Sequence, residues 1–144
     1  MGRVLNTALR WGNRTVAGLY RRSGGRLMGS VQKTPVLVLT VAGRTSGQQR
    51  STPVGYFPHD GGWLVVGSFN GGPVEPEWFK NLRKADRATV QIGRTVTAVV
   101  PEIVGEPERT ELYRDVVAAS SPGFAAYEKK TDRTIPIALL RPVP

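Results

Sequence analysis

From about residue 34 onward, hydrophobic residues fall in short runs between turn signals, a pattern that predicts strands rather than long helices. The predicted strands cover residues 35–41, 51–57, 63–68, 88–92, 96–104 and 135–140. Residues 58–62 form a hairpin signal, and Gly93-Arg94 joins another pair of strands. Helical spacing predicts helices over 77–84 and 107–119, with a short helix or turn over 122–130. This order predicts a mainly β protein with flanking helices, a small antiparallel barrel or sandwich.

The N-terminal part of the chain has a different pattern. Residues 3–22 have the spacing of an amphipathic helix, with arginines opposite the apolar side, and Ser23-Gly24-Gly25 ends it. Because arginines interrupt every apolar stretch, the segment predicts neither a signal peptide nor a transmembrane helix. We therefore divide the chain into a basic arm, residues 1–33, and a barrel domain, residues 34–144. The arm either lies on an anionic membrane surface or covers the core with a solvated basic face.

Composition excludes several kinds of chemistry. The 144 residues suit one domain, and they include no cysteine and a single histidine, His59. Disulfide scaffolds, thiolate metal sites and cysteine nucleophiles are therefore excluded, and we expect no metal site. His59 lies in the hairpin signal, so we expect an exposed turn residue and not the base of a catalytic triad. No glycine-rich dinucleotide or nucleoside-triphosphate motif occurs.

Charge is distributed unevenly along the chain. Twenty basic residues against eleven acidic ones give a net charge of +9. Residues 1–50 hold nine basic residues and no acidic one, whereas residues 51–144 hold eleven of each. This asymmetry predicts an anionic partner, namely nucleic acid, an anionic membrane, or a phosphorylated or polycarboxylate ligand. Nucleic acid is the weakest of these, because the chain has no base-reading motif and no aromatic stacking platform.

Two segments are candidates for ligand binding. Residues 43–53 place two arginines, four hydroxyls and two glycines in a tight loop between strands. Such a loop suits a phosphate or carboxylate ligand, although an ordinary polar hairpin has the same composition. Residues 67–72 form a glycine-rich stretch after a strand, followed by a helix with Trp78 and Asn81. This second segment leaves room for a flat ligand, but taken alone it favours a flexible loop beside a core tryptophan.

Four motifs in order carry a family resemblance. They are G-R-T-S-G-x-x-R-x-T-P at 43–53, D-G-G-W-L-V-V-G-S at 60–68, P-E-W-F-K-N-L at 76–82 and T-D-R-T-I-P at 131–136. Over residues 34–142 the chain resembles the deazaflavin-dependent nitroreductases, actinobacterial proteins that use coenzyme F420. The resemblance implies a six-stranded antiparallel split β-barrel of the FMN-binding type, with the deazaflavin in a groove on one side.

The resemblance also implies roles for individual residues. The loop residues that would hold the phosphate and acidic tail of the cofactor are Arg44, Thr45, Ser46, Gly47 and Arg50. The residues that would lie along the ring system are Pro53, Val54, Gly55, Tyr56, Gly67 and Ser68, and those that would close over it are Trp78, Asn81 and Leu82. The residues that would surround the substrate are Ser121, Phe124 and Tyr127, and their spacing of three residues predicts that they share one side of a helical turn. Of these, only Tyr127 matches a family tyrosine, so nitroimidazole reduction is not implied.

We therefore expect an oxidoreductase that transfers hydride from reduced F420 to a quinone-like or other conjugated acceptor. Ser68 and Tyr127 are the candidate proton donors or orienting groups. The deazaflavin carries the hydride, which accounts for the lack of a conventional catalytic cluster. The alternatives are a non-catalytic deazaflavin carrier and a basic membrane-binding module. FMN is disfavoured because one phosphate needs fewer arginines. We expect a cytoplasmic protein, with residues 1–30 as a candidate contact to the inner face of the membrane.

Overall fold

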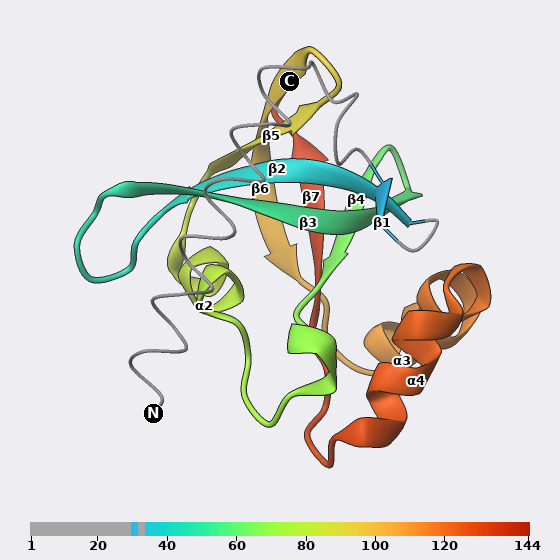
Figure 1. Ribbon diagram of the computed structural model, residues 1–144. Helices are drawn as coiled ribbons and strands as arrows, with labels where there is room; N and C mark the ends of the chain where they lie inside the picture. Colours follow the sequence, from blue (N-terminus) through green and yellow to red (C-terminus); the bar gives the residue numbers. More distant parts are fainter. Residues whose placement is uncertain (1–29, 32–33) are drawn as a thin grey trace.

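The computed structural model describes residues 30–31 and 34–144 (Figure 1). The helix expected over residues 3–22, and most of the basic arm with it, lie outside the described residues. The strands are β1 (Ser30–Val31), β2 (Thr34–Ala42), β3 (Gln49–His59), β4 (Gly62–Val66), β5 (Ala88–Ile92), β6 (Thr95–Ile103) and β7 (Ile137–Pro142). The helical elements are η1 (Phe69–Gly71), α2 (Glu77–Lys84), α3 (Glu108–Leu112), η2 (Tyr113–Ala118) and α4 (Pro122–Lys130).

Six strands close into an antiparallel barrel, which confirms the expected fold class. Strands β2, β3, β4, β7, β6 and β5 follow one another around the sheet, and β5 pairs back with β2 through Thr40 and Thr89. β1 adds a two-residue pairing to the start of β2. Helix α2 lies near the end of β2, whereas α3 and α4 lie together on another side of the barrel (Figure 1). Closure leaves each of the six strands hydrogen-bonded on both sides.

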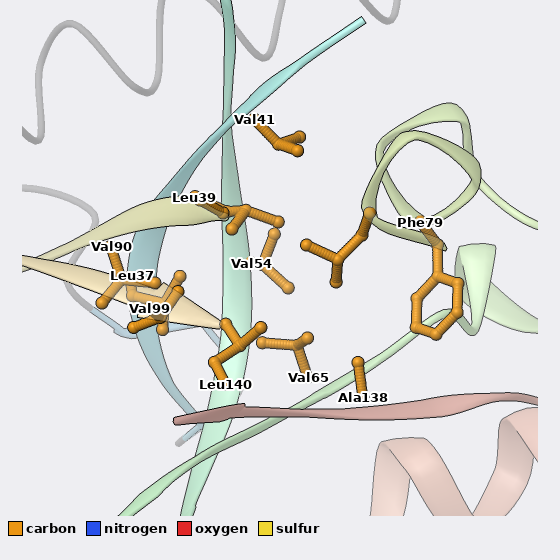
Figure 2. Close-up of a cluster of buried hydrophobic side chains, with 12 residues drawn as sticks. Leu37, Leu39, Val41, Val54, Val65, Phe79, Val90, Val99, Ala138 and Leu140 are labelled. Carbon is orange, nitrogen blue, oxygen red and sulfur yellow. The ribbon is translucent and has the colours of Figure 1, made fainter. Parts of the chain in front are cut away.

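The interior of the barrel is one apolar cluster, drawn in Figure 2. Alternate residues of β2, namely Leu37, Leu39 and Val41, point inward and are almost fully buried. Phe79 and Leu82 of α2 complete this cluster from one end. Helix α2 thus has a fixed place relative to the β2–β3 loop, because its apolar side belongs to the barrel core.

A second apolar cluster lies between the outer face of the barrel and the C-terminal helices. Phe57 of β3 and Leu64 of β4 are paired across the strands and face Tyr113, Val117 and their neighbours. The region expected as one helix over 107–119 is α3 followed by the wider π-helical turn η2. Helix α4 continues this layer with Phe124 and Tyr127 against the cluster. Phe57 of β3 and Leu64 of β4 are therefore covered by the C-terminal helices.

Several element boundaries differ from the sequence-based expectation by one or two residues. The β3–β4 hairpin turns in two residues, Asp60 and Gly61, both at positive φ (50° and 75°), so His59 is the half-buried end of a strand. β4 ends at Val66 and not at residue 68, because Ser68 begins the 3-10 turn η1. β7 begins at Ile137 instead of residue 135, after Pro136, which has no N–H to donate to a neighbouring strand.

Candidate functional site

The β2–β3 loop is tightly closed by its own hydrogen bonds. The Gly43 amide donates to the Gln48 carbonyl at 2.8 Å, and the Gly47 amide donates to the Gly43 carbonyl at 2.9 Å. Gly47 has a φ of 74° with open space around it, a conformation that favours glycine. Thr45 and Ser46 are exposed on this loop. The loop therefore presents hydroxyl groups and backbone on a fixed turn.

Arg44 joins this loop to helix α2. Its guanidinium donates to Oδ1 of Asn81 at 2.7 Å and to Oε2 of Glu77 at 2.8 Å. The Arg44 backbone amide donates to the same Asn81 oxygen at 3.1 Å. Asn81 is buried, whereas Arg44 and Glu77 are partly exposed. The hydrogen bond from Arg44 lowers the pKa of Glu77, so a carboxylate occupies this guanidinium at neutral pH.

Arg50 lies on the other side of the same loop. It is half-buried at the start of β3, opposite Val41 of β2. A Cβ placed on Gly43 would lie 2.8 Å from Oγ of Ser46 and 3.3 Å from Nε of Arg50. The absence of a side chain at Gly43 thus lets the Arg50 side chain and the loop approach each other. The two arginines expected to bind an anion flank one loop.

The residues expected along a ring system divide between the two faces of the barrel wall. Val54 and Leu82 are buried members of the interior cluster, and Tyr56 is partly buried and packs against it. Gly55 faces outward, where an added Cβ would lie 3.1 Å from Cγ2 of Thr34. Trp78 is half-buried at the cluster's edge, its ring 5.4 Å from that of Phe79. Leu82 and Val54 are thus core residues.

Ser68 lies in a close-packed turn at the end of β4. Ser68 is 7% exposed, and its carbonyl accepts a hydrogen bond from the Gly71 amide at 2.9 Å. Gly67, just before it, has no room for a side chain, since an added Cβ would lie 2.9 Å from the Phe79 ring. The Gly67 amide donates to the Pro136 carbonyl at 3.0 Å. The turn that carries Ser68 is therefore fixed against α2 and the segment before β7.

The expectation that Ser121, Phe124 and Tyr127 share one side of a helical turn is wrong for Ser121. Helix α4 begins at Pro122, and Ser121 precedes it, 2% exposed, with its hydroxyl 3.4 Å from that of Thr34. Phe124 packs edge-on against Phe57 and Tyr127, with ring centroids 5.4 and 5.3 Å apart. Ser121 thus holds α4 to β2, and Phe124 and Tyr127 form an aromatic pair.

The structure brings the turn of Ser68 beside the helix of Tyr127. A Cβ added to Gly71 would lie 3.1 Å from the Tyr127 carbonyl oxygen and 2.9 Å from Cβ of Lys130. Gly71 has a φ of 77°, so glycine is required there for both conformation and space. The two hydroxyl residues expected to handle a proton are therefore carried by adjacent elements.

Sequence reasoning assigned no role to Glu77 or Arg133. Glu77 lies within the P-E-W-F-K-N-L motif, and Arg133 within T-D-R-T-I-P. Their place in these motifs was the only sign in the sequence that they matter. Both residues contact segments distant in sequence, and a local pattern does not predict such contacts. Among the helices of the described residues, none combines the length and the apolar character needed to cross a membrane.

Comparison with known proteins decides the family. The sequence profile of the F420H(2)-dependent quinone reductases matches residues 11–142. The chain belongs to this family. It is 26% identical over 125 residues to the F420H(2)-dependent quinone reductase Rv1261c of Mycobacterium tuberculosis, covering 85% of this chain and 84% of that protein.

Solved structures agree with the fold. An F420-H2 dependent reductase, FDR-A, superposes with a TM-score of 0.67 at 28% identity, over 74% of this chain and 94% of that one. A chain described as a domain-swapped dimer superposes with a TM-score of 0.69 at 23% identity, over 93% and 99%. The second shows the fold alone. The expected F420-dependent oxidoreductase of the split β-barrel type, with a quinone-like acceptor, is confirmed by the family match.

Proposed function

We propose that this quinone reductase holds the acidic end of F420 at the β2–β3 loop and reduces flat, lipophilic quinones beside Ser68 and Tyr127. One contact supports the proposed binding of the acidic end most directly. The Arg44 guanidinium donates a hydrogen bond to the Glu77 carboxylate at 2.8 Å. That contact has the geometry of the charge-assisted pair that a phosphate or glutamate of the cofactor would form.

The donor set of the loop fits a polyanion. Arg44 and Arg50 flank exposed Thr45 and Ser46, and Gly47 leaves the space beside the turn open. Arginine presents several donors in one plane, which suits phosphate and carboxylate groups together. In this proposal Arg44 exchanges Glu77 for an anionic group of the cofactor while its backbone amide keeps the bond to Asn81. Trp78 lies one residue from Glu77 and closes over the bound cofactor.

Reduced F420, when bound, supplies the hydride of the reaction. A quinone that receives one hydride and one proton becomes the hydroquinone, so the protein has to hold the acceptor and provide a proton. We assign the orientation of the acceptor oxygen, and the proton, to the hydroxyls of Ser68 and Tyr127. Their elements touch at Gly71, which supports a shared task. The aromatic pair of Phe124 and Tyr127 adds an apolar surface that suits a flat ring.

The basic arm is the part of the chain that would bring the enzyme to a membrane. A lipophilic quinone resides in a membrane, and residues 1–30 carry six arginines and no acid. Each basic residue near an anionic bilayer contributes about 1 kcal/mol of binding free energy. We therefore include in the proposal a peripheral contact of this arm with the inner face of the cell membrane.

One titration tests the central assignment. The full chain is titrated with oxidised F420 and, separately, with FMN, and binding is followed optically. Saturable binding of F420 that weakens with added salt, together with weak binding of FMN, is the expected result, because long-range attraction to a polyanion is screened. Equal affinity for the two, or no dependence on salt, would contradict the role of the loop.

A further inference from the structure

Arg133 is the residue on which the turn after β4 is built. Its Nε donates to the Gly72 carbonyl at 3.0 Å, and its Nη2 donates to the carbonyls of Gly67 and Ser68 at 3.1 and 2.9 Å. One side chain thus bonds the start and the end of the Gly67–Gly72 turn. Because Arg133 follows α4, it reaches this turn from a segment about sixty residues further along the chain.

The turn that Arg133 spans contains a strained residue. Phe69 has a φ of 47°, in the left-handed region that residues with a bulky side chain rarely adopt. The Gly72 amide donates to the Phe69 carbonyl at 2.9 Å, and the Phe69 side chain is 37% exposed. Core burial of that ring therefore does not account for the conformation. A strained backbone persists only where surrounding contacts hold it, and it occurs preferentially at functional sites.

The guanidinium of Arg133 is committed to these carbonyls. Among the described residues it forms no ion pair, and the acid that acts on it from a longer distance, Glu75, is paired with Arg83. Its Nη1 is buried and has no hydrogen-bond partner within the described part of the chain. Burial lowers the pKa of Arg133. A half-buried cation without a carboxylate is costly, so the three backbone bonds are its main compensation.

We propose that Arg133 is a positioning residue that fixes the Gly67–Gly72 turn and thereby the place of the Ser68 hydroxyl at the reacting ring. This inference rests on the proposed role of Ser68. The function is geometric and needs the planar fork of arginine, because one Nη and Nε have to reach carbonyls at both ends of the turn. A lysine at this position keeps the charge but has no such fork.

The first test needs no cofactor. Hydrogen exchange at the Gly71 and Gly72 amides, which donate within the turn, is compared in the wild type, Arg133→Lys and Arg133→Met. We expect exchange to become at least about tenfold faster in both variants, since local opening costs less without the clamp. Unchanged exchange in either variant overturns the clamp, whatever the protein catalyses. If Arg133→Met does not fold, Arg133→Lys decides the question.

The second test reads the reaction. At saturating reduced F420, with menadione as acceptor, we expect both variants to lose kcat by about 2- to 12-fold, the range expected for loss of the Ser68 hydroxyl itself, while KM for menadione changes little. Arg109→Met is the control, because Arg109 is a buried arginine that donates to the Ile135 carbonyl without touching the turn. It should lower stability and leave kcat unchanged.

The two failures are distinguishable. Fast exchange in Arg133→Lys together with wild-type kcat overturns the positioning role, and so does an equal loss of kcat in Arg109→Met at equal stability. A wild type that binds F420 but turns over no quinone contradicts the proposed function instead. In that case the exchange data still decide whether Arg133 holds the turn.

Discussion

Arg44 bonds one oxygen of Asn81 twice, through its backbone amide at 3.1 Å and its guanidinium at 2.7 Å. Because Asn81 is buried in α2, and α2 is anchored in the barrel core, this shared acceptor fixes both the loop and the direction of the Arg44 side chain. A guanidinium held in this way is pre-organised, and little further entropy is lost when an anion binds.

Arg44→Ala should weaken F420 binding by about 10- to 150-fold, because a charge-assisted pair contributes roughly 1.5–3 kcal/mol. Arg50→Ala should weaken it within the same range. The measurement is an optical binding titration at low and high salt. Arg94→Ala is the charge-matched control: β5 runs antiparallel to β2, so Arg94 lies beyond the opposite end of β2 from the loop. Wild-type affinity in both Arg44→Ala and Arg50→Ala would contradict the loop assignment.

Glu77→Gln should tighten F420 binding by about 2- to 5-fold. In the ligand-free protein the Glu77 carboxylate occupies the Arg44 guanidinium, so an incoming anion has to replace it. The pair is largely exposed, and such pairs are worth about 0–1 kcal/mol, which sets the size of the effect. Glu102→Gln is the control, because it removes an acid of β6 that is paired with Arg141 of β7. Weaker binding in Glu77→Gln would mean that Glu77 orients Arg44 and does not compete with the ligand.

The barrel was predictable because its strands carry their own signals. The alternation of Leu37, Leu39 and Val41 and the turn glycines of the hairpins are local features, and they predicted six strands and their antiparallel order. Boundaries failed where a contact with a distant segment decides the conformation. Ser68 leaves the strand because the turn behind it is bonded to Arg133, which no local pattern encodes.

The candidate site was predictable only in part. The composition of the Arg44–Arg50 loop also fits an ordinary polar hairpin, and the loop was singled out because it lies in the first of the four ordered motifs. Ser121 was placed with Tyr127 by helical spacing, yet Pro122 begins the helix and leaves Ser121 buried against Thr34. Spacing gives the face of a helix only within its bounds, and those bounds depend on tertiary contacts.

Tyr113→Phe tests the layer that supports α4. The Tyr113 hydroxyl donates to the Phe124 carbonyl at 2.6 Å, and burial, with a smaller contribution from Glu128, raises the pKa of Tyr113 to about 12. The neutral phenol therefore stabilises the fold fully below pH 10, and this stabilisation is lost as the pH rises toward 12. At pH 7 the variant should lose about 0.5–1.5 kcal/mol in urea unfolding. The difference in unfolding free energy between wild type and variant should become smaller above pH 10. A difference that stays constant with pH would contradict the role of the neutral hydroxyl.

Removal of residues 1–30 should abolish binding to anionic vesicles without changing the affinity for F420. The segment holds six arginines and no acid, whereas the proposed cofactor contacts all lie after residue 43. Sedimentation with phosphatidylserine-containing vesicles, for the full chain and for the chain from Val31 onward, measures the first effect. Equal sedimentation of the two chains would remove the membrane role, and loss of F420 affinity would show that the arm belongs to the barrel.

The acceptor preference follows from the aromatic pair at α4. Phe124 packs on Phe57 and Tyr127, so this surface offers a single phenol and is otherwise apolar. A polar, bulky nitroimidazole loses a hydrogen bond there, worth roughly 0.5–1.5 kcal/mol, whereas a flat quinone keeps its ring contacts. Steady-state oxidation of reduced F420 should therefore be at least about 2- to 12-fold slower with a nitroimidazole than with menadione. Equal rates with both would contradict an apolar acceptor surface.

The hydroxyls of Ser68 and Tyr127 are tested in the same assay. Ser68→Ala and Tyr127→Phe should each lower kcat with menadione by about 2- to 12-fold, the loss of one hydrogen bond to the acceptor oxygen in the transition state. The effect should appear in kcat and not in F420 affinity, because the proposed anion contacts lie at the β2–β3 loop. Ser120→Ala, which removes an exposed hydroxyl next to Ser121, is the control. Wild-type kcat in both Ser68→Ala and Tyr127→Phe would mean that solvent, and not these hydroxyls, supplies the proton. Tight F420 binding without turnover of any quinone would favour a deazaflavin carrier.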